Sequence, residues 1–471
     1  MNGDTLFWAP RAWLAGAWAD SVLLRADALG RWAEITPNTP APPAPQQAHG
    51  QAQVQQVQVL PGPVLPSLVD AHSHAFQRAF VGLAERRDSE HDDFWSWRDR
   101  MYGVALRITP GQLQAVATQL YTELLAGGYT QVCEFHYLHH AEDGKPYTEH
   151  GADEWAMSRA LAAAAQAAGI GLTLLPVLYQ RAGFKQPSLR DDQRRFATDV
   201  ALVLRLRDRI RSWNLPHVSA GVAIHSLRAA AAASIRELAL QLTGDPGPIH
   251  IHIAEQTGEV SDCLAATGAR PIEWLARELP LDARWQLVHA THATPHEIDA
   301  VAASGAGVVL CPGTEANLGD GLADLPRWLA AGVPLSLGSD SQVTRGWPEE
   351  LRWLEYGQRL LLRQRNVAAA PGTQPATAAR LFERMRAGGA AAAGFAQWGL
   401  VPGARADLLV LDAAQSALCG LPPSHLLDGL VFAVPERPFA RVLVGGRWVD
   451  TCHGPTPVFT AAMQALWTPA G

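Results

Sequence analysis

Two histidines follow an apolar run near residue 70, in the pattern His72-Ser73-His74. The run at residues 64–70, VLPSLVD, predicts a buried strand. Strand side chains alternate between the two faces of a sheet, so both imidazoles lie on one face and can reach one metal ion. Two structural histidines with ordinary hydrogen bonds would give the same pattern. The pair therefore predicts a metal site only if the rest of the chain supplies further ligands.

The composition indicates an enzyme-sized globular protein. The chain has 471 residues, of which 48% are hydrophobic and 18% charged, enough for an α/β barrel with a satellite domain. A formal net charge of −7 offers no basic field, which argues against nucleic acid and anionic membranes as partners. No apolar stretch reaches the length of a membrane span and no signal peptide is evident, so we expect a cytoplasmic protein. The five cysteines lack CxxC spacing and indicate neither a disulfide framework nor a thiolate metal site.

Eight apolar runs alternate with Ala- and Leu-rich helical stretches. Such alternation is typical of parallel strands joined by crossover helices. Several of the runs end in His, Glu, Asp or Arg, as the strands of a (β/α)8 barrel do at the end that carries the active site. A doubly wound sheet is the alternative, but its Gly-rich phosphate loop is absent from the sequence. We therefore expect an α/β fold with a TIM-like (β/α)8 barrel, its strands lying within residues 64–74, 129–138, 171–180, 218–228, 249–255, 285–292, 307–313 and 333–341.

The two ends of the chain lack the alternation of strands and helices that its middle shows. Short strand-like segments with turns occur before residue 38 and again after Gly403, and we expect them to pair into one small β-sandwich domain. Residues 38–56 are rich in Pro, Ala and Gln without periodicity, which predicts a loop with no chemistry. The predicted organisation is 1–65 for the N-terminal part of the β domain, 66–395 for the barrel and 396–471 for the C-terminal part of the β domain.

Two further strand ends complete a metal-binding set with His72 and His74. The fifth run contributes His252, which is preferred over His250 because it lies nearer the C-terminal end on the same face. The eighth run ends at Asp340, which places a carboxylate at the barrel mouth. Three imidazoles and one carboxylate leave room for water, which is typical of a catalytic rather than a structural site. Zinc is the preferred metal and iron the second choice.

Two more polar residues can serve proton transfer at such a centre. A bound metal lowers the pKa of its water from about 15.7 to about 7, and a carboxylate beside it can then protonate the leaving group. Glu255, just beyond the fifth strand, suits that role, although a solvated glutamate is its plainer reading. His289, at the end of the sixth strand, can orient the water or stabilise an intermediate. His292 is its rival, but a loop histidine is the simpler interpretation.

The lysine content argues for one metal ion rather than two. A carboxylated lysine usually bridges two metals in barrels of this kind, and the chain has only two lysines, Lys145 and Lys185, in loop-like sequence. A glutamate could replace the bridge, and Glu134 is the candidate. Strand parity instead predicts that Glu134 faces the barrel interior as a partner of other polar groups.

Six longer motifs carry a family resemblance that covers the chain from about Asp70 to Asp340. The motifs, in chain order, are HSHAFQRAFVGLAER, FWSWRDRMY, GYTQVCEFHYLHH, GVAIHSLRA, HIHIAEQ and LCPGTEANLGDG. With these motifs and the metal-binding set above, the chain resembles the amidohydrolase superfamily in its single-metal deaminase branch, and within it the formimidoylglutamate deiminase family.

This resemblance implies hydrolysis of N-formimino-L-glutamate to N-formyl-L-glutamate and ammonia, a step of histidine degradation. It implies one zinc ion per chain on His72, His74, His252 and Asp340, with Glu255 and His289 serving the proton transfers and the positioning of water. In the mechanism that we expect, Asp340 also acts as a catalytic residue by accepting a proton from the water. Substrate contacts would come from the matching positions Gln77, Arg98, Tyr137, His225 and Arg228.

The two arginines support that substrate class on chemical grounds. A glutamate-like substrate brings two carboxylates, and the planar guanidinium binds a carboxylate through two parallel hydrogen bonds. Arg98 could instead form an ordinary salt bridge with Asp92, Asp93 or Asp99. Trp95 and Trp97 are expected to pack the surrounding loop against the barrel.

Other readings remain open at this point. The chain could be another aminohydrolase of the same branch, of the purine or triazine deaminase type. It could also be a non-catalytic metal-binding homologue, which the complete ligand set argues against. A small-molecule substrate with carboxylates is the expected partner, and the sequence leaves a homodimer open.

Overall fold

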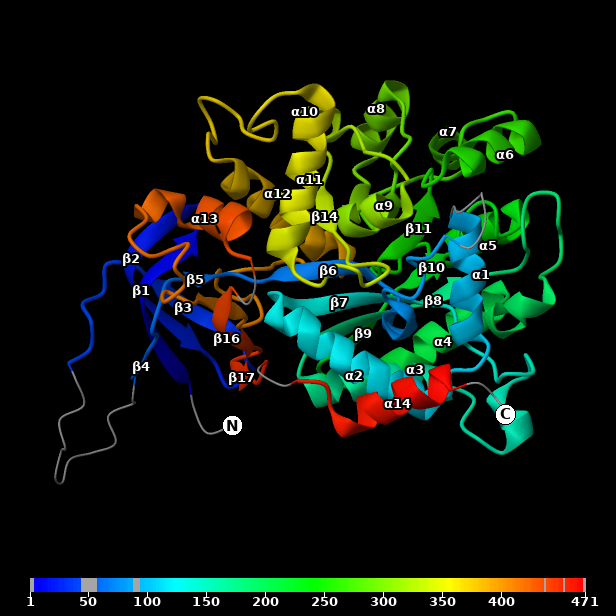
Figure 1. The fold of residues 1–471 in the computed structure, drawn as a ribbon, viewed down its shortest axis with the longest axis horizontal. Helices are drawn as coiled ribbons and strands as arrows, with labels where there is room; N and C mark the ends of the chain where they lie inside the picture. The colour runs from blue at the N-terminus through cyan, green and yellow to red at the C-terminus, as the bar shows by residue number, and fades with distance from the viewer. Residues whose placement is uncertain (1–3, 44–56, 88–93, 436–437, 452–453, 469–471) are drawn as a thin grey trace.

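The computed structural model describes residues 4–43, 57–87, 94–435, 438–451 and 454–468. Residues 44–56 of the predicted loop at 38–56 lie outside these ranges. Within them, no helix is both long enough and apolar enough to cross a membrane. The molecule has a parallel barrel in its centre and a terminal sheet at one end (Figure 1).

A closed barrel of parallel strands forms the centre, as the sequence predicts. All eight predicted runs contain a strand, and the barrel closes where β14 pairs with β6 and β8 pairs with β10. Almost every strand side chain is buried, because helices cover the outer face of the barrel and side chains fill its interior. The barrel strands are β6 (Leu68–Ser73), β7 (Tyr129–His136), β8 (Gly171–Leu178), β9 (Val218–Ala220), β10 (Val222–Ile224), β11 (Ile249–Ile253), β12 (Trp285–His289), β13 (Gly307–Leu310) and β14 (Leu335–Leu337).

The fourth barrel strand is interrupted at Gly221, which separates β9 from β10. A Cβ atom at Gly221 would lie 2.3 Å from the carbonyl oxygen of Pro248. Only glycine lets the neighbouring backbone approach so closely. Beyond the interruption, β10 pairs with both β8 and β11.

Helices surround the barrel and cover its ends (Figure 1). The helices between strands are α2 (Pro110–Ala126), α3 (Ala156–Ala168), α4 (Val200–Ser212), α5 (Ala232–Gln241), α6 (Thr257–Thr267), α7 (Pro271–Glu278), α8 (Pro295–Ser304) and α10 (Leu325–Ala331), followed by α11 (Trp347–Leu362) and α12 (Thr377–Ala392). Shorter elements lie in the loops after the strands, namely η1 (Ala75–Phe80), α1 (Phe94–Ala105), η2 (Tyr147–His150), η3 (Asp191–Phe196) and α9 (Pro312–Leu318).

The end of α12 closes the barrel at the end opposite to the predicted site. His250 Nε2 donates to the carbonyl of Ala392 at 2.8 Å, and Thr173 Oγ1 donates to the carbonyl of Ala393 at 3.3 Å. These bonds satisfy carbonyl groups that the last turn of a helix leaves without partners. They also make His250 a structural residue, in agreement with the preference for His252 as the metal ligand.

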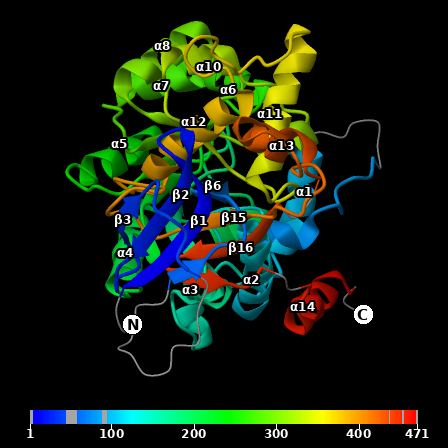
Figure 2. The same ribbon diagram turned by 90° about the vertical axis from the view of Figure 1, so that its left-hand side faces the viewer.

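Strands from both ends of the chain pair with each other, as expected. They form one mixed sheet of eight strands, in which β4 and β5 run parallel to β1 and the other pairs are antiparallel. Figure 2 shows the molecule from the side of this sheet. The sheet has a small apolar core of its own, separate from that of the barrel. Its strands are β1 (Thr5–Leu14), β2 (Ala17–Ala26), β3 (Trp32–Thr36), β4 (Val57–Val59), β5 (Val64–Leu65), β15 (Leu408–Leu411), β16 (Phe439–Val444) and β17 (Arg447–Val449).

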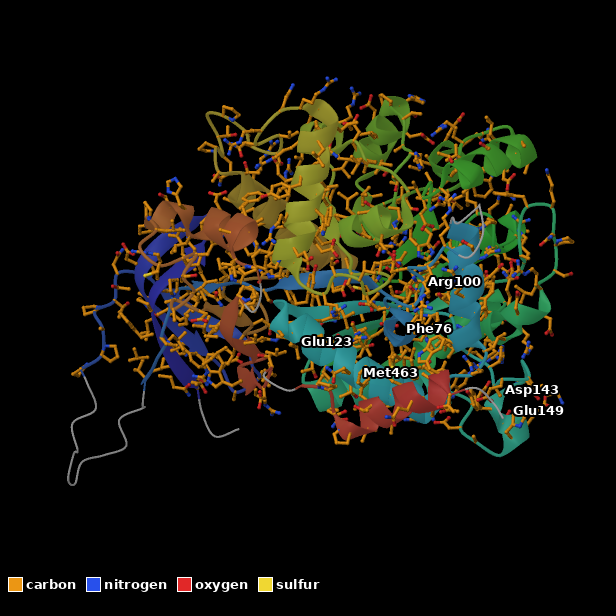
Figure 3. The ribbon with its side chains drawn as sticks, in the orientation of Figure 1. Phe76, Arg100, Glu123, Asp143, Glu149 and Met463 are labelled. Atoms are coloured by element: carbon orange, nitrogen blue, oxygen red, sulfur yellow. The ribbon has the colours of Figure 1, made fainter. Side chains whose placement is uncertain are left out.

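The last helices return to the barrel. The short η4 (Pro423–His425) leads into α13 (Leu426–Ala433), which packs against α11 and α12, whereas α14 (Pro457–Trp467) packs against α2. Figure 3 shows Glu123 of α2 and Met463 of α14 on this flank. The indole Nε1 of Trp467 donates to the carbonyl of Ala79 at 2.8 Å. The C-terminal helix thus contacts η1, the segment that follows the two histidines of β6.

A buried polar cluster joins the barrel to the terminal sheet. The carboxylate of Asp407, just before β15, is 3% exposed and accepts a hydrogen bond from Thr130 Oγ1 at 2.6 Å. It also pairs with Arg405 and accepts the backbone N–H of Gly445. Arg405 in turn donates to the carbonyl of Thr130 and to the side chain of Gln131 at the start of β7. One carboxylate therefore fixes the sheet against the base of the barrel.

We expect Asp407→Ala to lower the free energy of unfolding by about 3 kcal/mol, because it leaves a largely buried guanidinium without its counter-ion. Urea denaturation followed by circular dichroism measures this. The control is Glu278→Ala, which removes the partner of Arg236 at the surface and should change stability little. Equal losses in the two variants would show that the cluster does not stabilise the junction.

Candidate active site

The closure of the barrel between β14 and β6 brings Asp340 to the two histidines of β6. The backbone N–H of Asp340 donates to the carbonyl of His72 at 2.9 Å, and Asp340 forms a parallel bridge with Ser73. Gly338 permits this approach, because a Cβ atom there would lie 2.6 Å from the Cβ of His72. Asp70 fastens the same strand ends by accepting the backbone N–H and the hydroxyl of Ser339, at 2.9 and 2.6 Å.

Four predicted ligand side chains converge at this point. His72 Nε2 lies 3.0 Å from His252 Nε2 and 3.4 Å from Asp340 Oδ1, and His74 Nε2 lies 3.5 Å from the same oxygen. All four residues are buried, with exposed fractions of 0% to 8%. The structure therefore brings together His72, His74, His252 and Asp340 from three strand ends.

The hydrogen bonds of the imidazoles fit a cation at this point. The Nδ1 atom of His74 faces the carbonyl of Phe135 at 3.0 Å, and that of His252 faces the carbonyl of His225 at 2.9 Å. A carbonyl only accepts, so each Nδ1 carries the proton and each Nε2 presents a lone pair. Burial also lowers the pKa of all three imidazoles, that of His72 to about 3, which keeps them neutral. Neutral imidazoles facing a carboxylate form the ligand set that a divalent metal requires.

The backbone is left-handed where the strands meet the site. The φ angles are 52° at Ala254, 71° at His289 and 49° at Asp340, a region that side chains other than glycine seldom adopt. Each sharp turn directs a polar side chain over the end of the barrel instead of continuing the strand. Such strain is maintained only where surrounding contacts determine the backbone, and it is typical of functional sites.

Glu255 and His289 lie beside the four convergent residues. His289 Nε2 is 3.8 Å from Glu255 Oε1 and 3.8 Å from Asp340 Oδ2. Burial raises the pKa of Glu255 to about 7, although the charge of His289 opposes the shift. Burial alone would lower the pKa of His289, but Glu255, Glu315 and Asp340 raise it to about 10. A carboxyl group with a pKa near neutrality can both hold and release a proton.

Glu315 orients His289 and was not recognised from the sequence, although it lies in the quoted motif LCPGTEANLGDG. Its Oε1 atom is 3.4 Å from His289 Nδ1 and accepts the backbone N–H of Cys311 at 3.0 Å. This contact leaves His289 Nε2 to face Glu255 and Asp340. Burial raises the pKa of the Cys311 thiol well above its usual value, so that thiol is protonated and is a poor metal ligand.

A pocket opens above these residues, and the five predicted substrate-contact residues line it. Gln77, Arg98, Tyr137, His225 and Arg228 share it with His74, His252, Glu255, His289 and Asp340. Gln77 Nε2 donates to the hydroxyl of Tyr137 at 3.2 Å. Six further lining residues were not selected from the sequence, namely Trp97, Met101, Tyr102, Tyr179, Phe196 and Leu318.

The prediction that Glu134 faces the barrel interior was wrong. Its carboxylate accepts hydrogen bonds from Ser73 Oγ and from the hydroxyl of Tyr121, which belongs to the outer helix α2. The neighbouring Phe135 occupies the interior instead, 4.3 Å from the ring centre of His252. Strand side chains alternate, so an interior Phe135 requires an outward Glu134. Glu134 also accepts the backbone N–H of Ala75 and thus supports the turn after His74.

The other residues considered as ligands or substrate contacts have different surroundings. His292 lines a separate cavity with Arg270 and Thr291, outside the pocket described above. Asp99 pairs with Arg190 rather than with Arg98, at 3.2 Å, while Asp92 and Asp93 lie outside the described residues. Trp97 packs on Phe80, with ring centres 5.4 Å apart, and also lines the pocket; the side chain of Trp95 lies outside the described residues. Neither lysine lines the pocket.

Comparisons with known proteins agree with this geometry. The model of the amidohydrolase family matches residues 64–449. The formimidoylglutamate deiminase of Pseudomonas aeruginosa is 45% identical over 442 residues, which cover 94% of this chain and 93% of that protein. The crystal structure of an amidohydrolase from Brucella melitensis superposes with a TM-score of 0.88 at 39% identity, over 98% of this chain and 100% of that one. An adenosine deaminase from Xanthomonas campestris with bound zinc shares the fold, with a TM-score of 0.75 at 21% identity over 98% of this chain and 96% of that one.

Proposed function

The chain belongs to the amidohydrolase family, and from that premise we propose that it hydrolyses N-formimino-L-glutamate to N-formyl-L-glutamate and ammonia, a step of histidine degradation. The relative from Pseudomonas aeruginosa bears the name of this activity and matches nearly the whole chain. The geometry supports the proposal by combining a hydrolytic centre with a cationic pocket.

The observation that carries the proposal is the pair of arginines on that pocket. Arg98 and Arg228 both line it. Burial lowers the pKa of Arg98, and the like charge of Arg228 lowers it further, which places the two cations within electrostatic reach of each other. The acidic residues that line the pocket, Glu255 and Asp340, belong to the hydrolytic centre. A dicarboxylate substrate offers carboxylate acceptors for both guanidinium groups, whereas a purine or triazine offers none.

One zinc ion per chain is the metal that we propose, with iron as the second choice. His72, His74, His252 and Asp340 would hold it, since their acceptor atoms converge and their imidazoles are neutral. The metal, when bound, supplies Lewis-acid activation of a water molecule at neutral pH.

The residues of the chain would carry out the proton transfers. The Asp340 carboxylate accepts the first proton from the attacking water, and Glu255 delivers a proton to the nitrogen that departs. Asp340 then passes its proton to the same nitrogen, and Glu255 regains a proton from the hydroxyl group on the attacked carbon. The nitrogen has thus gained two protons and leaves as ammonia, while the carbon becomes a formyl group. His289, charged at neutral pH and fixed by Glu315, donates through Nε2 to the oxygen that becomes negative. Its Nε2 atom lies 3.8 Å from both Glu255 Oε1 and Asp340 Oδ2, so the three groups lie beside one another at the end of the barrel.

The function itself is tested by ammonia release from N-formimino-L-glutamate with purified protein. We expect steady release, its loss after chelation and its return on addition of zinc. Elemental analysis should find about one metal ion per chain, and much less in His252→Ala and Asp340→Asn. The control is His250→Ala. His250 lies on the same face of the strand as His252 but is not a proposed ligand, so the metal content should stay the same. Release that is unaffected by complete metal removal would contradict the proposed centre.

The proton-transfer role of Glu255 is tested by Glu255→Gln. The amide keeps the size of the side chain but cannot carry the proton, so we expect kcat to fall at least about a hundredfold. Metal content should stay the same, because Glu255 is not among the proposed ligands. The matched control is Glu297→Gln, another buried carboxylate, at the start of α8 and outside the pocket. An unchanged kcat in Glu255→Gln would exclude this role.

The role of Arg228 in binding is tested by Arg228→Ala with two substrates. We expect kcat/KM for N-formimino-L-glutamate to fall about ten- to a hundredfold, the usual loss when a charged hydrogen-bond partner is removed. N-propylformamidine, which has no carboxylate, should lose much less. Arg236→Ala at the protein surface is the control. Equal losses for the two compounds would indicate that Arg228 is structural.

A further inference from the structure

Two tyrosines and one glutamine form a buried cluster at the wall of the pocket. Tyr102 lies on α1, Tyr179 directly after β8, and Gln193 on η3. Their exposed fractions are 3%, 4% and 0%. Both tyrosines line the substrate pocket, whereas Gln193 lies behind them. We call these three residues the Gln193 cluster.

The hydrogen bonds fix the orientation of the Gln193 amide. Its Oε1 atom accepts the backbone N–H of Arg190 at 3.1 Å, and a backbone N–H can only donate. The amide nitrogen must therefore face the other way. There, Nε2 lies 3.0 Å from the hydroxyl oxygen of Tyr102 and 3.0 Å from that of Tyr179. Gln193 uses both of its N–H groups on the two tyrosines.

This arrangement turns the tyrosine hydroxyls into donors. Each phenol oxygen already accepts a hydrogen bond from Gln193, so its own hydrogen must go elsewhere. A hydrogen bond from one hydroxyl to the other would use only one of the two hydrogens. At least one hydroxyl hydrogen remains for a group in the pocket. A buried donor of this kind requires an acceptor.

The charges around the cluster indicate which chemical group accepts the hydrogen bond from the tyrosine hydroxyl. Arg98 lies over the ring of Tyr102, with its Cζ atom 5.6 Å from the ring centre, and Arg228 lines the same pocket. Arg190 lies 5.5 Å from the same ring centre but pairs with Asp99 and Asp192. Hydroxyl donors beside two pocket guanidinium groups fit a carboxylate, which only accepts hydrogen bonds.

The position of the cluster indicates which carboxylate it would contact. The candidate metal ligands His74 and His252 are in ring contact with Tyr137 and His225, at 5.1 and 5.0 Å. Tyr179 lies one layer further out, against His225 at 4.4 Å. With the formimino group at the hydrolytic centre, the α-carboxylate lies close to it and the side-chain carboxylate reaches further. The outer layer therefore corresponds to the side-chain carboxylate.

We propose that Tyr102 and Tyr179 bind the side-chain carboxylate of the substrate and that Gln193 is the positioning residue that makes their hydroxyls donate. This inference rests on the proposed function for the identity of the substrate. It assigns to the hydroxyl groups a selectivity for dicarboxylates beyond the attraction of the arginines. Gln193 itself does not contact the ligand.

The experiment compares two product-like ligands by isothermal titration calorimetry, which requires no turnover. N-Formyl-L-glutamate carries both carboxylates, and N-formyl-L-norvaline lacks only the one in the side chain. Gln193→Met keeps the length of the side chain but removes both donors. We expect its Kd for N-formyl-L-glutamate to rise about tenfold, the loss for one or two hydrogen bonds to a charged group. Its Kd for N-formyl-L-norvaline should change less than about twofold.

Gln193→Glu separates the orientation of the hydroxyls from simple loss of packing. A carboxylate at this position would accept the tyrosine hydrogens and add a negative charge behind the pocket. N-Formyl-L-glutamate should therefore bind more weakly to Gln193→Glu than to Gln193→Met. Tyr179→Phe, which keeps the ring, should weaken N-formyl-L-glutamate selectively as well. The matched control is Gln358→Met, which removes a buried amide donor on α11 outside the pocket and should leave both Kd values unchanged.

The outcomes separate this inference from the proposed function. Equal weakening of both ligands by Gln193→Met would overturn the inference and leave the activity intact. So would binding of N-formyl-L-glutamate that is as strong in Gln193→Glu as in the unmodified chain. Failure of the unmodified chain to release ammonia from N-formimino-L-glutamate would overturn the proposed function, and the calorimetric comparison would still decide whether the cluster binds a side-chain carboxylate.

Discussion

The structure depends above all on one pairing, between the last barrel strand and the first. The bond from Asp340 N–H to the carbonyl of His72 and the two bonds from Ser339 to Asp70 close the barrel at its functional end. The same contacts place a carboxylate beside two imidazoles that are far from it in the sequence. Closure of the barrel and the meeting of Asp340 with His72 and His74 therefore depend on the same contacts. A parallel barrel suits this chemistry because every strand ends at the same rim.

Burial sets the protonation states of the residues in the centre, and it also makes hydrogen-bond partners necessary for them. Desolvation lowers the pKa of the histidines and raises that of Glu255, which yields neutral ligands and a carboxyl group near its titration point. Buried polar groups are tolerated only where they are hydrogen-bonded. Here the backbone carbonyls of Phe135 and His225 and the carboxylate of Glu315 are the partners of His74, His252 and His289, whereas Nδ1 of His72 has none among the described residues. Residues that never meet the substrate thus determine which nitrogen atoms face the reaction.

The sequence predicted those parts of the molecule that follow from strand periodicity. Each of the eight apolar runs contains a strand, and the polar residues at their ends meet because parallel strands share one rim. Parity failed at Glu134, where the assignment depended on which of two alternating faces was interior. Periodicity also could not place Tyr102 and Gln193, which lie on α1 and η3 in the loops above the barrel. Tertiary packing alone brings those segments together, and no short-range pattern in the sequence records it.

This difference between strand ends and loops has a functional meaning. The candidate metal ligands and proton carriers lie at the ends of β6, β11, β12 and β14, held by the hydrogen bonds of the closed barrel. Gln77, Arg98, Tyr102 and Gln193 instead come from η1, α1 and η3, which can change in sequence without disturbing the sheet. Substrate selection therefore draws partly on loop segments, although Tyr137, Tyr179 and His225 directly follow barrel strands. A family with this fold can keep one reaction centre while its loops accept a purine in one member and, as we propose here, a dicarboxylate in another.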